Sequence, residues 1–222
     1  MVRRAATSGG RPPTSLNYVD THWLFRLVES LKLSEGRQVT LNYRELLKSL
    51  GEARKTFGLS DADASLAPAA VDVRSESQQR FVEALKQIGF VVDPIDYRAT
   101  FVSNPPGDDK VERGQTSTLA HYAAYMMGLL AERESPEIVL VTGAFELYLP
   151  LLDFTRRRGG RAVLAFFRRY LDPRWIEIGR IGETDAVAPF YDLEQRGEAL
   201  LGGALKSMAP DIEATLPGLG RL

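Results

Sequence analysis

The segment at residues 137–152, EIVLVTGAFELYLPLL, constrains the fold more than any other part of the chain. An unbroken apolar run, IVLV, is followed by Thr142 and Gly143 and then by a helical pattern of apolar residues. A strand that is apolar on both faces is typical of a sheet covered by helices on both sides. In an open α/β sheet, ligands bind just beyond the carboxyl ends of such strands. We therefore expect a candidate site at residues 142–146.

The rest of the chain alternates short apolar strands with amphipathic helices. Predicted strands lie at residues 16–20, 69–74, 90–95, 162–167 and 190–193, and predicted helices at 22–33, 41–50, 76–87, 116–132, 148–158 and 194–208. Residues 51–68 lose this periodicity and are predicted to form an inserted loop. Ser75 is predicted to cap one helix through a capping box with Gln78, and Gly89 to end it. Strands separated by helices predict an α/β three-layer sandwich with a mainly parallel central sheet.

Composition excludes several classes of function. With no cysteine among its 222 residues, the chain has no disulfide, thiolate metal site or cysteine nucleophile. Its 28 Lys and Arg against 29 Asp and Glu give a net charge of -1, so the whole molecule does not attract nucleic acid or anionic lipid strongly. No apolar run approaches the ~20 residues of a membrane span. We expect a cytoplasmic protein without a membrane partner.

Three regions follow from this pattern. Residues 1–15 are rich in Gly, Pro, Ser and Arg and are predicted to be a disordered leader. Residues 16–193 form the predicted α/β domain, and residues 194–222 a C-terminal helix and tail.

Six segments, taken in order, carry a family resemblance. They are LNYVD, QQRFVEALKQIGFVV, VERGQTSTLAHY, IVLVTGAFELYLPLL, RRRGGRAVLAF and APFYDL. In this order they resemble the NYN domains, the LabA-like branch of the PIN-like nuclease superfamily, over about residues 16–193. The resemblance implies a PIN-like fold. Family members that cut RNA have carboxylates at the edge of the sheet. These carboxylates hold Mg²⁺ or Mn²⁺, and the metal activates water.

Few of the family's acidic residues survive in this sequence. Asp20 matches the first acid, whereas the family's Asn three residues later falls on Trp23. A later Asp falls on Thr116, and the two Asp residues of the signature strand fall on Ala144 and Glu146. The resemblance therefore implies a pseudo-nuclease without a cofactor. The alternative is a ribonuclease in which Asp20 and Glu146 are catalytic ligands of Mg or Mn and Thr116 holds a water.

Each candidate residue also has a purely structural explanation. Asp20 is equally suited to cap the following helix, and Glu146 to be a solvated acid at a helix start. His22 and His121 form a candidate acid/base pair, although helix histidines are more often surface or packing residues. Trp23 either fills the cleft or anchors a partner protein.

A group of seven arginines provides a candidate RNA-binding surface. We call it the arginine group; it consists of Arg156, Arg157, Arg158, Arg161, Arg168, Arg169 and Arg174. Arginine matches phosphate geometry, and Tyr170 and Trp175 are placed to stack bases. Arginine also collects at solvated helix ends. The predicted function is therefore binding, either of RNA or of a protein partner. A second copy of the chain is one such partner, since the helices at 41–50 and 194–208 have apolar stripes.

Overall fold

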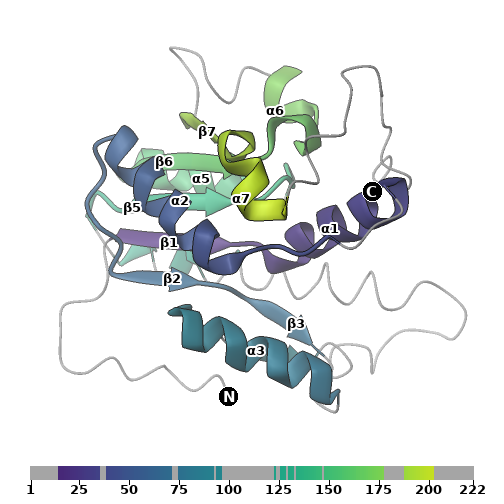
Figure 1. Cartoon of the computed structure of the whole chain (residues 1–222). Coiled ribbons are helices and arrows are strands. Elements are labelled where there is room, and N and C mark those ends of the chain that lie inside the picture. The colour runs from purple at the N-terminus through teal and green to yellow at the C-terminus, as the bar shows by residue number, and fades with distance from the viewer. Residues whose placement is uncertain are drawn as a thin grey trace, which may run out of the picture.

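The computed structural model describes residues 15–35, 39–71, 75–92, 94–96, 123, 126–128, 130–132, 134–146, 148–177 and 188–202. Its central sheet has five strands, all parallel, in the order β2-β1-β5-β6-β7 (Figure 1). Their bounds are Ala64–Leu66 for β2, Ser15–Val19 for β1, Glu137–Val141 for β5, Arg161–Phe166 for β6 and Phe190–Asp192 for β7. The predicted α/β fold with a parallel sheet is confirmed.

A second, two-stranded sheet continues the first. It pairs β3 (Ala69–Val71) with β4 (Pro94–Asp96) in parallel. Just before β4, Val91 forms a parallel bridge with Leu66 of β2. The segment that contains β4 therefore runs along the outer side of β2 and β3. Numbered along the chain, the strands of the five-stranded sheet lie in the doubly wound order 2-1-3-4-5, whose switch point falls between β1 and β5.

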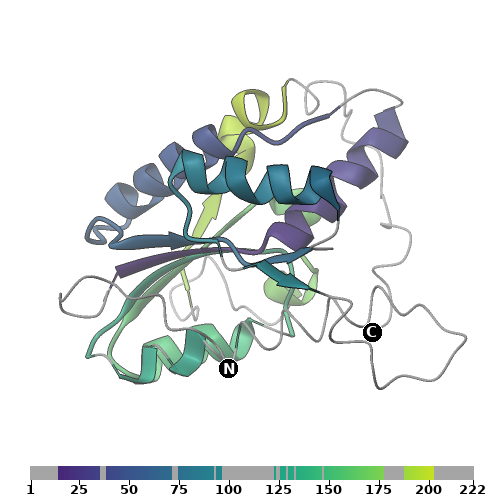
Figure 2. The ribbon, with the colours of Figure 1, turned by 90° about the horizontal axis from the view of Figure 1, so that it is seen from below.

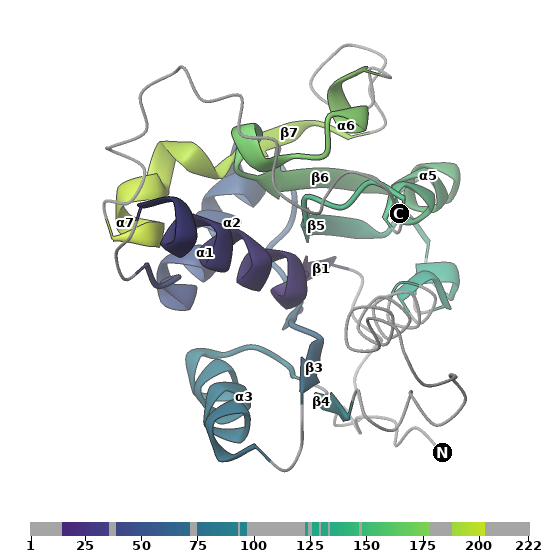
Figure 3. The same ribbon diagram turned by 90° about the vertical axis from the view of Figure 1, so that its right-hand side faces the viewer.

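Helices cover both faces of the sheet. The described helices are α1 (Thr21–Glu35), α2 (Tyr43–Thr56), α3 (Glu76–Ile88), α5 (Leu149–Arg157), α6 (Arg174–Glu177) and α7 (Gly197–Leu201), with two 3-10 turns, η2 (Arg168–Tyr170) and η3 (Leu193–Arg196). Seen from below, α1, α2 and α3 lie on one side of the sheet and α5 on the other (Figure 2). The side view places α7 beside α1 and α2 (Figure 3). No described helix is long and apolar enough to cross a membrane.

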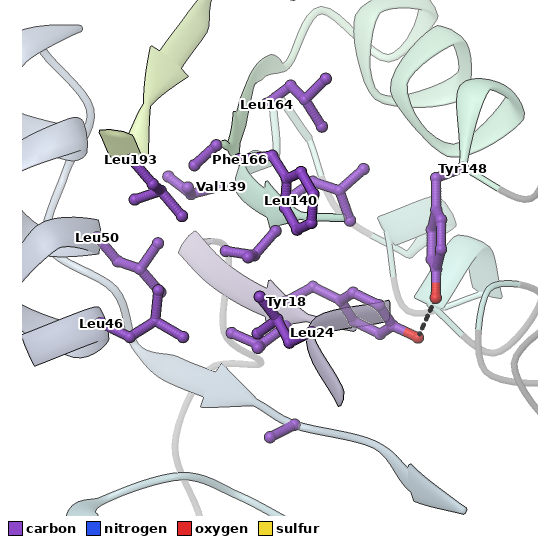
Figure 4. Packing of buried hydrophobic residues seen from close by; sticks show 14 of the residues in the cluster. Tyr18, Leu24, Leu46, Leu50, Val139, Leu140, Tyr148, Leu164, Phe166 and Leu193 are labelled. Carbon is purple, nitrogen blue, oxygen red and sulfur yellow. Dashed lines mark hydrogen bonds between the residues drawn. The ribbon is translucent and has the colours of Figure 1, made fainter. Parts of the chain in front are cut away.

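The core lies between these layers. Val139 and Leu140 of β5 are fully buried, as the apolar run predicts. Leu46 and Leu50 of α2 cover one face of the sheet, whereas Tyr148 lies at the other end of the core and points toward Tyr18 (Figure 4). Burial of side chains of this size stabilises a fold by about 1.5–3 kcal/mol each.

The prediction of a loop at residues 51–68 is wrong. Helix α2 continues past Gly51 to Thr56, because Ala53 and Arg54 on its last turns are buried. The chain then forms β2, which pairs with β1. The predicted leader of residues 1–15 also extends one residue too far, since Ser15 belongs to β1 and is buried.

Three other predicted elements differ from the structure. The strand expected at 90–95 is only a bridge at Val91 followed by β4. Ser75 precedes α3, but its side chain forms no capping hydrogen bond; its carbonyl oxygen accepts from the N–H groups of Gln78 and Gln79. Of the helix expected at 194–208, residues 194–202 form a 3-10 turn followed by the short α7, and residues 203–208 lie outside the described part of the chain. The predicted cap at Gly89 is confirmed by its φ of 116°.

A buried arginine fixes the amino-terminal edge of the sheet. Arg54 is 1% exposed. It donates to the Asn17 side chain at 2.8 Å, to the Ser15 hydroxyl at 2.6 Å, and to the carbonyl oxygens of Ser60 at 2.7 Å and Leu16 at 2.6 Å. Burial lowers the pKa of the guanidinium, and negative charges at Glu137 and in the adjacent loop oppose that shift. This clasp joins the last turn of α2 to β1.

Candidate functional site

Asp20 lies at the switch point of the sheet, where strands β1 and β5 end side by side. Its carboxylate is completely buried. One oxygen, Oδ1, accepts from the backbone N–H of Trp23 at 3.0 Å, and Oδ2 accepts from the Thr142 hydroxyl at 2.9 Å. Thr142 in turn accepts from the N–H of Ala144 at 3.0 Å. Asp20 is therefore an N-cap of α1 that also ties this helix to the turn after β5.

The surroundings of Asp20 make its charge costly. Burial raises the pKa of Asp20 to about 6, although hydrogen bonds from Trp23, Thr142 and Tyr148 oppose this shift. Tyr148 is also buried, and burial together with the nearby Asp20 raises the pKa of its hydroxyl well above the usual value. The hydroxyls of Tyr148 and Tyr18 are 3.4 Å apart. A continuous polar chain thus runs through the core from Thr142 to Tyr18.

Trp23 fills the space above the turn that follows β5. A Cβ atom added at Gly143 would overlap the indole Nε1 of Trp23 and would lie 2.7 Å from its Cδ1. Only a glycine leaves room for this ring. At the position where the NYN domains that the sequence resembles have an Asn, this chain has an aromatic ring packed against the turn after the neighbouring strand β5.

We expect Gly143→Ala to destabilise the protein by about 1–3 kcal/mol, since the new methyl group overpacks against Trp23. The cost should fall by at least ~1 kcal/mol in a Trp23→Ala background, where the ring is absent. Urea unfolding of the four variants measures this coupling. Gly51→Ala is the control, because nothing lies within 4 Å of that position. Equal costs of Gly143→Ala in both backgrounds would show that the indole does not occupy the turn.

Glu146 is not part of this buried network, because it pairs with Arg174 instead. Its side chain is 52% exposed and forms an ion pair with Arg174. Arg174 also binds Asp172 through two hydrogen bonds, at 2.9 Å and 2.6 Å. The pKa of Asp172 is lowered, because the hydrogen bonds from Arg174 outweigh the effect of burial. The ion pair between Asp172 and Arg174 was not predicted from the sequence, although the two residues are only two positions apart.

These residues, as they are arranged, do not fit a divalent cation. Such a cation needs several free oxygen ligands. Both oxygens of Asp20 accept hydrogen bonds from the protein, and Glu146 is engaged by a guanidinium. Ala144, where the NYN domains that the sequence resembles have an acid, is an apolar residue that is 7% exposed. Among the described residues, no three His, Cys, Asp or Glu side chains are grouped to hold a metal.

The arginine group divides into two parts. Four members form ion pairs: Arg161 with Glu137, Arg168 with Asp192, Arg169 with Glu194, and Arg174 with Asp172 and Glu146. The other three, Arg156, Arg157 and Arg158, are exposed at the end of α5. Their helix ends in a turn at Gly159, whose φ is 70°.

The two aromatic residues expected to stack bases are buried instead. Tyr170 is 5% exposed and Trp175 is fully buried, so neither presents a ring face to a nucleic acid. Trp175 packs edge-on against Phe145, with ring centroids 4.9 Å apart. Of the remaining candidates, His22 is half-buried on α1, whereas Thr116 and His121 lie outside the described residues.

Comparisons with known proteins bear on the fold alone. No protein-family model matches the sequence, and no curated protein matches it either. Among solved structures, a crystal structure of a protein of unknown function from Vibrio parahaemolyticus is similar, with a TM-score of 0.50. The two sequences are 13% identical, and the match covers 87% of this chain and 99% of the other. The NYN resemblance remains a prediction.

Proposed function

We propose that this chain is a catalytically degenerate NYN/PIN-like domain that acts in the cytoplasm by binding a protein partner or a second copy of itself. One observation carries the proposal: the indole of Trp23 fills the switch point of the sheet. Ligands of doubly wound folds bind at that point. The neighbouring Asp20 carboxylate has no exposed surface and makes hydrogen bonds through both oxygens.

Two features favour a protein partner over RNA. Ion pairs neutralise four of the seven arginines, and their neighbouring aromatic rings are buried. Helix α1, by contrast, exposes two large apolar side chains, Phe25 at 60% and Leu33 at 84%. Aromatic residues such as Phe are enriched in protein–protein interfaces relative to the rest of the surface.

RNA binding is the second candidate, and the remaining arginines support it. Arg156, Arg157 and Arg158 are consecutive and exposed. Neither Arg156 nor Arg157 has an ion-pair partner among the residues that the structure describes. This function predicts salt-dependent binding, because phosphate contacts release counterions.

A single set of assays separates these functions from ribonuclease activity. We expect the purified protein to leave single-stranded RNA intact in the presence of Mn²⁺, because Asp20 and Glu146 are engaged within the protein. Cleavage that Asp20→Asn abolishes would instead establish the nuclease. RNA binding that Arg156→Glu with Arg157→Glu weakens, but Arg169→Glu does not, would establish the second candidate. A sizing column measures self-association, which Phe25→Ser with Leu33→Ser should abolish if α1 forms the contact.

A further inference from the structure

Arg174 holds together two carboxylates that follow neighbouring strands. Its Nε and Nη2 donate to the two oxygens of Asp172, beyond β6, at 2.9 Å and 2.6 Å. Its Nη1 donates to Glu146, beyond β5. Since β5 and β6 are adjacent and parallel, one guanidinium bridges acids from two segments at the carboxyl edge of the sheet.

Packing fixes the orientation of this guanidinium. It lies over the ring of Phe145, with Cζ 5.3 Å from the ring centroid, a favourable distance for a cation and an aromatic face. The segment that carries it is anchored to the carbonyl oxygen of Gly143, which accepts from the Asp172 N–H at 3.1 Å and from the Trp175 indole at 3.2 Å. The side chain stays 42% exposed, so ions in solution reach it.

We propose that Arg174 supplies, from within the chain, the positive charge that the carboxylates at this edge would otherwise draw from a divalent cation. This inference rests on the proposed non-catalytic function. Two carboxylates that share a site repel each other, and an opposite charge close to both favours their charged forms. A guanidinium meets this need permanently, because it is charged at all physiological pH values and binds a carboxylate through two parallel hydrogen bonds. The edge is then stable without a metal.

The test compares Arg174→Ala with the wild-type protein in MgCl₂ and in KCl at equal ionic strength. In KCl the melting temperature of the variant should be about 2–5 °C lower than that of the wild type. Millimolar Mg²⁺ should recover part of this loss, since a ligand that binds only the folded state stabilises it. The wild-type melting temperature should be the same in both salts. Arg169→Ala, which breaks an ion pair with one acid only, should show no preference for Mg²⁺.

A triple variant identifies the acids involved. Adding Glu146→Gln and Asp172→Asn to Arg174→Ala should remove the response to Mg²⁺. The inference is overturned if Arg174→Ala responds equally to both salts, or if the wild-type protein responds to Mg²⁺ as strongly as the variant. Neither result depends on RNA cleavage, so failure here is distinct from failure of the proposed function.

Discussion

Replacement of Arg54 by alanine should destabilise the protein by about 3–5 kcal/mol, because it leaves buried hydrogen-bond acceptors without their donor. The acceptors are the Asn17 side chain, the Ser15 hydroxyl and the carbonyl oxygen of Leu16. Chemical denaturation followed by circular dichroism measures the loss. Such a loss is a large part of the stability of a typical domain, which is about 5–15 kcal/mol.

Arg44 provides the matched control, since it lies on the same helix and is exposed. Arg44→Ala should change the free energy of unfolding by no more than about 0.5 kcal/mol. Native-state hydrogen exchange adds a local readout. The N–H of Asp63, which donates to the Ser15 carbonyl at 2.8 Å, should exchange faster in Arg54→Ala. If the two arginine variants were equally stable, the clasp would have no role in holding α2 to β1.

The second large expected effect is a dependence of the free energy of unfolding on pH. The pKa of Asp20 is about 6 in the folded protein against 3.8 without the fold, so the native state binds this proton more tightly. The resulting stabilisation is full below pH 3.8 and is lost as the pH rises through 6. A difference of this size corresponds to about 3 kcal/mol. The groups that face Asp20 are Trp23, Thr142, Tyr148 and the backbone of His22.

Asp20→Asn isolates this contribution, because an amide carries no charge to bury. Relative to the wild type, the variant should gain about 3 kcal/mol of stability between pH 4 and pH 7. Unfolding in urea at several pH values measures the difference. Glu134→Gln, which neutralises an exposed carboxylate, controls for general charge effects. A difference between Asp20→Asn and wild type that does not change with pH would mean that burial does not perturb Asp20.

Local patterns predicted the elements that depend on a single stretch of sequence. The apolar run of β5 and the glycine turn before β6 are of this kind. β2 was missed because its three residues, Ala64, Ser65 and Leu66, have no strand pattern and depend on pairing with β1. The continuation of α2 was missed for a similar reason: Gly51 suggested a stop, but the burial of Arg54 carries the helix further.

The candidate site was predicted in position but not in chemistry. The doubly wound order brings Asp20 to the turn after β5, as strand ends in such a sheet require. Its bond with Thr142, 122 residues away, has no signal in the sequence. Counting arginines likewise could not show that Glu137, Asp192 and Glu194 neutralise three of them. Pairing depends on distances that only the folded chain defines.

The ring of Trp23 above Gly143 limits what a single substitution at the carboxyl edge of the sheet can achieve. Placing an acid at Ala144 would add charge beside a ring that already excludes solvent from the turn, and Glu146 would remain bound to Arg174. A metal site at this edge would therefore require substitutions in three separate segments, since each substitution made singly leaves the other obstacles in place.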